Sequence, residues 1–277
     1  MISAVAVVVP ARDEHLRIRS CLRAVRHALA RLPDGVTGTV CVVADRCADD
    51  TAALAATELP TARIVTANAD RTIGEVRDLG VRAALTALDG HPAAGVWILS
   101  TDADTVVHRD WARRHVRLAD AGFDAIAGIA HLDRPAGATR AALERYAAVV
   151  GRARGPWGHG NVYGANLGVR ADAFDAVGGF GPVPVGEDHD LWRRLGAAGY
   201  SRRHADIPVV TSARHDGRAR GGLADLLATL DQSVPSGPGG PPDPRQVVTA
   251  PSGSRRPPDG CPPHRWPPGP PAERRNT

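Results

Sequence analysis

The sequence contains no lysine, and all 34 of its basic residues are arginine. This absence excludes reactions that need a lysine, among them Schiff-base and pyridoxal-phosphate chemistry. It also excludes a P-loop, because the lysine of that motif contacts the phosphates of a bound nucleotide.

Cysteine is scarce, and long apolar runs are absent. The four cysteines are Cys21, Cys41, Cys47 and Cys261, and none of them forms a C-x-x-C pair. This pattern indicates the reduced thiols of a cytoplasmic protein and not a disulfide framework. No apolar run reaches the roughly 18 residues of a membrane span, and the N-terminus lacks the basic region of a signal peptide. The expected location is the cytoplasm, either in solution or at the inner face of the membrane.

Charge and proline content divide the chain in two. From residue 232 onward six arginines face three acids, which accounts for +3 of the total charge of +4. The preceding residues carry only +1, with no basic stripe among aromatics, so no nucleic-acid partner is expected. Fourteen of the 23 prolines also fall from residue 233 onward. We expect a folded domain over residues 1–231 and a disordered Pro-rich tail over residues 232–277.

Apolar runs alternate with amphipathic segments along the expected domain. Runs of β-branched residues predict buried strands, and apolar residues that recur every three or four positions predict helices. The expected strands are residues 3–9, 39–44, 62–66, 96–99, 125–130, 166–170 and 208–212, with Pro10 ending the first. The expected helices are residues 18–32, 49–59, 73–88, 110–121, 138–150, 172–177, 187–198 and 223–230, with a mobile glycine-rich loop at 155–164. This alternation predicts an α/β fold whose mostly parallel sheet has helices on both faces.

Two carboxylates follow the apolar strand at residues 96–99. They are Asp102 and Asp104, and in an extended segment they would point to the same side, roughly 6–7 Å apart at Cα. The carboxyl end of a parallel strand is where open α/β sheets bind ligands. Two converging acids without a nearby lysine need a cation, and a divalent ion that holds a diphosphate meets that need. The simpler alternative is a strand end with two solvated acids.

Five short segments at expected strand ends and loops occur in one order. They are residues 9–14 (VPARDE), 44–51 (ADRCADDT), 74–80 (GEVRDLG), 102–104 (DAD) and 186–193 (GEDHDLWR). Together they resemble the family 2 glycosyltransferases of GT-A fold, in the nucleotide-diphospho-sugar transferase superfamily. Residues 164–170 (GANLGVR), followed by 178–180 (GGF), look like the acceptor-side loop of that family and the turn after it. The resemblance covers residues 3–230 and implies a Rossmann-like sandwich with a mostly parallel central sheet.

The resemblance places a nucleotide pocket at the first of these segments. The residues that would bind the nucleotide sugar are Pro10, Ala11, Arg12, Glu14, Asp45, Arg77, Asp102 and Ala103. Asp45 would bind the base, because a carboxylate accepts from a uracil or guanine N–H. Arg77 would bind the base or a phosphate with its planar fork. The alternatives are a loop acid for Asp45 and a solvated helix residue for Arg77. The family usually has Asn after this arginine, where this chain has Asp78.

The resemblance also implies a divalent metal ion. Asp104 would bind the ion, and Asp102 would reach the ribose or a metal-bound water as part of the same metal site. His215 resembles the metal-binding histidine found late in some relatives. A set of imidazole, carboxylate and phosphate ligands suits Mn²⁺ as well as Mg²⁺. The alternative for His215 is a polar loop residue that binds no metal.

Residues nearer the C-terminus would serve the acceptor. Glu187 and Asp188 open a helix, where acids also stabilise the helix dipole. The functional interpretation makes Asp188 the catalytic general base for an acceptor hydroxyl, while Glu187 caps the helix or binds acceptor hydroxyls. Trp157 would stack on a sugar ring or act as a packing anchor. The acceptor loop would consist of Gly164, Ala165 and Asn166.

These features favour an enzyme that transfers a sugar from a nucleotide-diphosphate sugar to a hydroxyl of a small or lipid-linked acceptor. The metal ion would act as Lewis acid on the leaving diphosphate. The second hypothesis is a nucleotide-sugar-binding or degenerate homologue without turnover, which the altered Asp78 suggests. A nucleotidyltransferase on a related sheet is disfavoured, because it needs an N-terminal glycine-rich loop and usually a lysine. The sugar, the base, the acceptor and the stereochemical outcome stay open.

Overall fold

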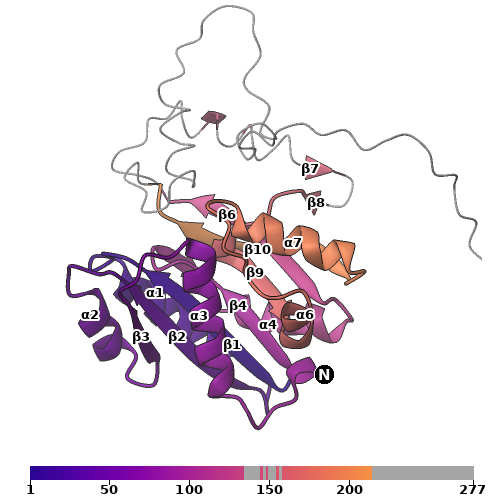
Figure 1. Cartoon of the computed structure of the whole chain (residues 1–277). Coiled ribbons are helices and arrows are strands. Elements are labelled where there is room, and N and C mark those ends of the chain that lie inside the picture. Colours follow the sequence, from indigo (N-terminus) through magenta and orange to yellow (C-terminus); the bar gives the residue numbers. More distant parts are fainter. Residues whose placement is uncertain (134–143, 146–147, 149–153, 156–157, 214–277) are drawn as a thin grey trace, which may run out of the picture.

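The computed structural model describes residues 1–133, 144–145, 148, 154–155 and 158–213 (Figure 1). The expected helix at 223–230, most of the expected helix at 138–150 and the expected tail at 232–277 lie outside these residues. The domain boundary at residue 231 therefore stays a prediction. Within the described part of the chain, no helix is long and apolar enough to cross a membrane.

An eight-stranded sheet with the order β3-β2-β1-β4-β9-β6-β10-β5 forms the centre of the fold. Its strands are β1 (Ala4–Ala11), β2 (Thr37–Asp45), β3 (Arg63–Ala67), β4 (Val96–Ser100), β5 (Thr105–Val107), β6 (Ala125–Leu132), β9 (Leu167–Arg170) and β10 (Arg202–Thr211). The helices are α1 (Ile18–Leu29), α2 (Thr51–Glu58), α3 (Ile73–Thr86), α4 (Trp111–Asp120), α6 (Ala171–Ala176) and α7 (Glu187–Ala197), with short 3-10 turns η1 (Ala93–Gly95) and η2 (Gly164–Asn166).

Four of the seven neighbouring strand pairs in this sheet are parallel and three are antiparallel. The chain passes from β1 to β2 and β3 in one direction, then returns to add β4 on the other side of β1. The carboxyl ends of β1 and β4 therefore meet at a switch of direction, where open α/β sheets bind ligands. The expected α/β fold with a mostly parallel sheet is confirmed.

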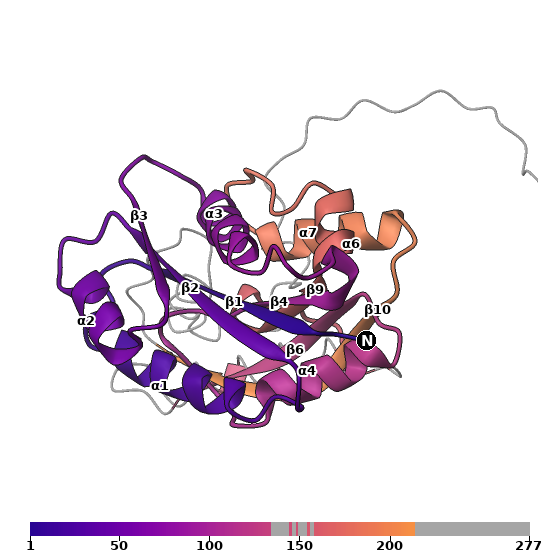
Figure 2. The same cartoon turned by 90° about the horizontal axis from the view of Figure 1, so that it is seen from below.

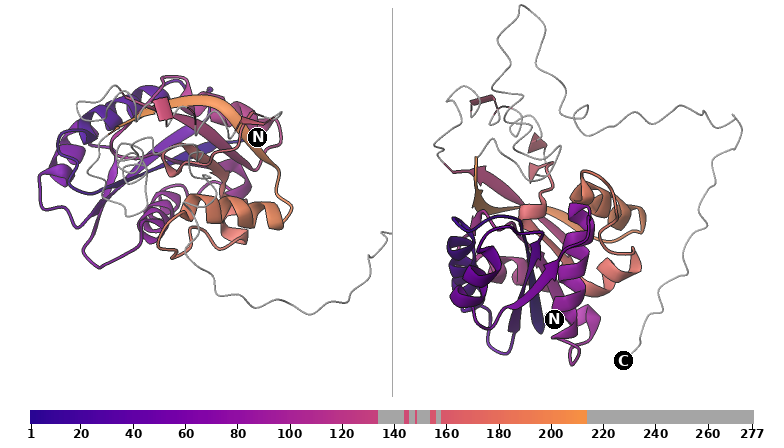
Figure 3. Two further views of the ribbon diagram at one scale, coloured as in Figure 1. Left: turned by 90° about the horizontal axis from the view of Figure 1, so that it is seen from above. Right: turned by 60° about the vertical axis from the view of Figure 1, so that its left-hand side comes forward.

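Helices cover both faces of the sheet. Figure 2 shows α1, α2 and α4 on one side of the strands and α3, α6 and α7 on the other, and the left view of Figure 3 shows the two layers from the opposite end. Val5 and Val7 of β1 pack toward the first layer, and Ala4 and Ala6 pack toward the second. Burial on both sides explains why this strand is a continuous apolar run and not an alternating one.

The helix α3 lies unusually close to the sheet. A Cβ atom at Gly80 would lie 2.6 Å from Val8 Cγ1 and 2.8 Å from Val43 Cγ2. A capping box closes the first turn, because the Thr72 N–H donates to Glu75 Oε2 over 2.8 Å and the Glu75 N–H donates to Thr72 Oγ1 over 3.3 Å. The close contact and the cap together fix this helix, which contributes one side chain to the site described below.

Strand β1 continues through Pro10, so the expectation that this proline ends the strand is wrong. Ala11 still pairs with Ala44 of β2. The register between β1 and β4 ends at Val8, whose carbonyl faces the β4 side. Alternate residues of a strand direct their amides to the same neighbour, so Pro10 faces β4 beyond the last pair. Its missing N–H therefore costs no bond in the sheet.

The C-terminal half of the sheet is larger than expected. β10 begins at Arg202 and not near residue 208, and no sequence pattern indicates β5. The guanidinium groups of Arg202 and Arg203 each lie over an aromatic ring, that of Trp192 and that of Phe123, at 5.2 Å from the ring centroid. Contacts of this cation–π kind let the strand extend through charged residues.

The sequence predicts a loop over the whole glycine-rich segment at residues 155–164, but the structure places strand residues in it. Strands β7 (Arg154–Gly155) and β8 (Gly158–His159) form a short antiparallel pair within it. The expectation for residues 155–164 is therefore wrong in part. The η2 turn follows this pair and leads directly into β9.

Candidate active site

The candidate site lies at the carboxyl edge of the parallel strands. Ala11 ends β1, Asp45 ends β2, and the Asp-x-Asp segment follows β4. β9 runs in the opposite direction, and its first residue, Leu167, pairs with Ser100 at the end of β4. The η2 turn before β9 therefore reaches the same edge of the sheet. Segments from both halves of the chain meet here.

Asp45 is held by the arginine that follows it. The residue is 9% exposed, and Arg46 donates from Nε to Asp45 Oδ1 over 3.1 Å. Arg46 has a left-handed backbone with a φ of 46° and also forms an ion pair with Asp70. Asp45 is thus a fixed carboxylate at the end of a buried strand.

Glu14 joins the segment after β1 to the start of α2. Its side chain is buried, and its backbone N–H donates to Thr51 Oγ1 over 2.7 Å. Its carbonyl accepts from the N–H groups of Arg17 and Ile18, where α1 begins. Arg12, two residues earlier, is half-buried. Glu14 therefore fixes the loop that borders the expected nucleotide pocket.

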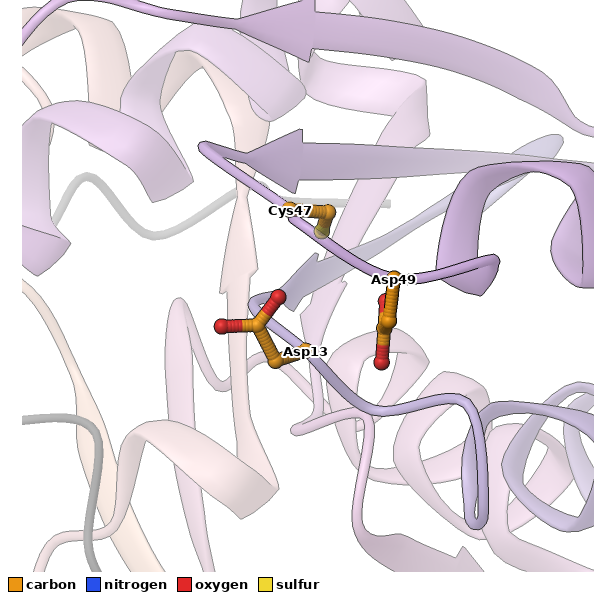
Figure 4. Close-up of side chains that lie close together, drawn as sticks. All are labelled: Asp13, Cys47 and Asp49. Atoms are coloured by element: carbon orange, nitrogen blue, oxygen red, sulfur yellow. The ribbon is translucent and has the colours of Figure 1, made fainter.

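Three side chains on the loops after β1 and β2 lie close enough to share a metal ion. Ligand atoms of Asp13, Cys47 and Asp49 lie within 4.8 Å of one another, on the loops after β1 and β2 (Figure 4). Asp13 accepts from the Ala48 N–H over 2.7 Å, and Asp49 accepts from the His15 N–H over 3.1 Å. These bonds give the cluster a structural role, which is to join the two loops.

Asp102 and Asp104 lie in a turn. The Thr105 N–H donates to the Asp102 carbonyl over 3.0 Å, so the segment folds back after β4. The expectation that both carboxylates project from one side of an extended strand is wrong. Asp104 Oδ1 accepts from Thr211 Oγ1 over 3.3 Å at the end of β10, and Ala103 is buried between the two half-buried aspartates.

Arg77 joins three segments of the chain. The residue is 4% exposed, so the alternative of a solvated helix residue is wrong. Its guanidinium donates from Nε to Glu187 Oε1 over 3.0 Å, from Nη1 to Ser100 Oγ over 2.7 Å and from Nη2 to Asp102 Oδ1 over 2.6 Å. Burial lowers the pKa of Arg77, but the charges of Asp102 and Glu187 outweigh this effect and raise it. Arg77 thus balances the charge of Asp102, so the two carboxylates Asp102 and Asp104 do not by themselves require a metal ion.

Glu187 points into the protein. It is 6% exposed, and burial raises its pKa against the opposing charge of Arg77. No side-chain hydrogen bond caps the start of α7. The expectation that Glu187 caps the helix or faces an acceptor is therefore replaced by a buried contact with Arg77.

Asp188 lies against the expected acceptor loop. It is half-buried, and its Oδ2 accepts from the Gly164 N–H over 2.7 Å. Gly186, just before the helix, has a φ of 77°, a conformation that glycine adopts without strain. Ala165, next to the hydrogen-bonded glycine, is buried. The structure therefore brings the predicted base and the predicted loop into direct contact.

Asn166 has a role in the core. It is 0% exposed, and its Nδ2 donates to the carbonyls of Ile129 and Ile207 over 3.0 and 2.8 Å. Its Oδ1 accepts from Trp111 Nε1 over 2.9 Å. The side chain ties β6, β10 and α4 together, so it is directed away from the acceptor that the sequence analysis assigns to it.

Two of the expected site residues, Trp157 and His215, lie outside the described residues. Two hydroxyl residues of the site are not predicted from the sequence. Ser100 binds Arg77, and Thr211 binds Asp104. Each hydroxyl ends a strand of the sheet at the carboxyl edge, and this placement is the signal that could identify them.

The comparisons with known proteins agree with this geometry. A family model described as "Glycosyltransferase like family 2" matches residues 3–217. No curated protein matches the chain by sequence. The mannosyltransferase PcManGT from Pyrobaculum calidifontis, solved with GDP-Man and Mn²⁺, has a TM-score of 0.56 and 19% identity, covering 81% of this chain and 68% of that one. S. aureus TarS, solved with UDP-GlcNAc, has a TM-score of 0.56 and 12% identity, covering 83% of this chain and 65% of that one.

These likenesses establish a shared GT-A fold, and the chain spans about two thirds of the length of both solved proteins. The family model matches well over half of the chain. The protein is therefore a member of glycosyltransferase family 2.

Proposed function

We propose that the protein transfers a sugar from a nucleotide-diphosphate sugar to an acceptor hydroxyl. One observation carries this proposal: Asp102 after β4 and Asp188 in the first turn of α7 meet at one edge of the sheet, joined through Arg77 and Glu187. We assign Asp102 to the donor and Asp188 to the acceptor. The family supports sugar transfer, and the similar proteins solved with GDP-Man and UDP-GlcNAc support the donor class. In this proposal Asp45 accepts a hydrogen bond from the base, and its contact with Arg46 keeps it in place.

A divalent ion fits the residues that follow β4. The carboxylate oxygens of Asp102 and Asp104 are ligands that Mn²⁺ and Mg²⁺ accept, and PcManGT was solved with Mn²⁺. Both side chains are half-buried at the site edge, and Thr211 orients Asp104. When bound, such an ion supplies Lewis-acid stabilisation of the leaving diphosphate. The proposed third ligand, His215, lies outside the described residues.

Asp188 acts as the general base in an inverting reaction. It removes the proton from the acceptor hydroxyl while the hydroxyl oxygen bonds to the anomeric carbon. The bond between that carbon and the diphosphate oxygen breaks, and the nucleotide diphosphate leaves. The Gly164 N–H holds Asp188 Oδ2 and the His189 N–H holds Asp188 Oδ1, each over 2.7 Å, so two backbone amides orient the carboxylate. A base in this position contributes about 10²–10⁴-fold in rate.

The acceptor that we propose is a small or lipid-linked alcohol, used in the cytoplasm or at the inner face of the membrane. The thiols support this location, since Cys21, Cys41 and Cys47 are all unpaired in the described structure. Free thiols of this kind, two of them buried, are typical of a reducing compartment.

Thermal-shift screening of nucleotide sugars, with and without Mn²⁺, followed by turnover assays, tests the proposal. A donor should raise Tm by mass action. Asp188→Asn should keep that Tm shift and lower turnover at least a hundredfold. Asp190→Asn is the matched control, because Asp190 lies in the same turn but pairs with Arg193 and Arg194. Wild-type turnover in Asp188→Asn, or products with retained stereochemistry, would remove the base role.

The alternative is a nucleotide-sugar-binding protein without turnover, and Asp78 is the residue that suggests it. Asp78 accepts from Arg82 Nε over 2.8 Å, one turn further along α3. This pairing lies apart from the contacts of Arg77, so the unusual residue leaves those contacts intact. A donor-dependent Tm shift with no turnover for any acceptor would favour this alternative.

A further inference from the structure

The contact between Arg77 and Glu187 spans the two sides of the site. The residues are 110 positions apart, one on α3 and the other in the first turn of α7. Arg77 is 4% exposed and Glu187 is 6% exposed, so the ion pair is buried. The guanidinium offers little surface to a base or a phosphate, the partners that the sequence resemblance implies. Its partners in the structure point to a different role.

We propose that Arg77 and Glu187 are positioning residues that set the carboxylate of Asp188 relative to that of Asp102. The inference rests on the proposed function, in which these two aspartates serve the acceptor and the donor. Arg77 reaches Asp102 through Nη2 over 2.6 Å and Glu187 through Nε over 3.0 Å. One rigid fork therefore fixes the turn after β4 and the start of α7 at a defined separation.

The helix geometry carries this constraint from Glu187 to Asp188. Neighbouring residues of an α-helix project about 100° apart. A fixed Glu187 side chain therefore sets the rotation of the first turn of α7, and with it the direction of Asp188. The fixed turn requires glycine before it, because Gly186 has a φ of 77°.

Arg77 also supports the hydrogen bond between the Gly164 N–H and Asp188. A Cβ atom at Gly164 would lie 2.6 Å from Arg77 Nη2, so the backbone of Gly164 rests directly on the guanidinium. The N–H of the same glycine donates to Asp188 Oδ2 over 2.7 Å. Loss of Arg77 would loosen both the helix turn and the amide that hold the base.

The test removes the pair without leaving a buried charge. In Arg77→Met/Glu187→Met, apolar side chains of similar length replace the ion pair, a change that buried sites often tolerate. Asp102 loses one partner, but its side chain is 34% exposed and stays solvated. We expect kcat to fall at least tenfold, while the donor KM and the donor-induced Tm shift change less than threefold.

Two further variants separate positioning from loss of structure. Glu187→Gln can still accept from Arg77 Nε, so it should keep kcat within threefold of the wild type. Arg82→Gln is the matched control, because Arg82 lies on the same helix in an exposed pair with Asp78, and it should change neither kinetic parameter. A lower Tm with unchanged kcat and KM in the double variant would mean that the pair is only structural. A tenfold rise in donor KM with unchanged kcat would mean that Arg77 binds the donor directly.

The inference stays testable if the proposed function fails. A wild-type protein without turnover for any donor and acceptor would refute the function, and hydrogen exchange would then decide the positioning role. The Gly164 amide should exchange at least tenfold faster in the double variant than in the wild type, with the amides of β1 unchanged. Equal exchange at Gly164 in the two proteins would overturn the inference.

Discussion

Acidification is expected to destabilise this protein through His115. The residue lies in α4 with 0% exposure, and its ring packs beside Trp97 and Trp111 at centroid distances of 6.4 and 5.7 Å. Burial lowers the pKa of His115 from 6.5 to about 4, although a hydrogen bond with Asn166 opposes the effect. The folded protein therefore holds this imidazole neutral where the unfolded chain protonates it.

The sign and size of the effect follow from proton linkage. Between pH 6.5 and 4 the unfolded state binds more protons, so stability is fully present above pH 6.5 and is lost as the pH falls toward 4. A pKa lowered from 6.5 to about 4 corresponds to about 3 kcal/mol in the free energy of unfolding. Between pH 7 and pH 5 the expected share is about 2 kcal/mol.

Urea unfolding at pH 7 and pH 5, followed by tryptophan fluorescence, measures this loss. His115→Phe keeps an aromatic ring but cannot titrate, so its loss of unfolding free energy between the two pH values should be smaller than that of the wild type by about 2 kcal/mol. His27→Gln is the control, because His27 is exposed on α1, and it should behave as the wild type. Equal losses in the wild type and His115→Phe would refute the reasoning.

Two other substitutions test the metal ion and the packing of α3. Asp104→Ala should lower turnover roughly a thousandfold and abolish the effect of Mn²⁺ on the donor-induced Tm shift; full activity of the variant in chelator would contradict the metal proposal. Gly80→Ala should lower the free energy of unfolding by about 1–3 kcal/mol, because the added Cβ would meet Val8 and Val43 at 2.6 and 2.8 Å. Gly90→Ala is its control, since a Cβ at Gly90 meets nothing within 4 Å, and equal stability of the two variants would contradict the packing argument.

The sheet is predictable where local pattern and burial agree. β1 and β4 are continuous apolar runs because helices cover both of their faces, so composition alone indicates them. The start of β10 is not predictable in this way. Arg202 and Arg203 are charged, and in the fold their guanidinium groups lie over the rings of Trp192, in the preceding helix, and Phe123, which is 80 residues earlier. Such contacts leave no periodic signal in the sequence.

The site residues also divide into those that a local sequence pattern indicates and those that only the fold brings together. Asp102 and Asp188 stand out because short motifs mark them, and the structure places both at the same edge. The partners of Arg77 do not stand out, because Glu187 lies 110 positions further along the chain and meets Arg77 only in the folded structure. Asn166 shows the opposite case: its motif suggests exposure, but the fold buries the amide against two backbone carbonyls.

The meeting of Arg77, Gly164 and Asp188 at one edge of the sheet depends on the antiparallel direction of a single strand, β9. β9 is antiparallel to β4 and β6, so its first residue, Leu167, lies beside Ser100 at the carboxyl edge. A parallel β9 would begin at the opposite edge, and the η2 turn would begin there with it. Gly164 could then neither rest on Arg77 nor donate to Asp188, as it does over 2.7 Å. The reversed strand is therefore what brings Gly164 to the edge of the sheet where Arg77 and Asp188 meet it.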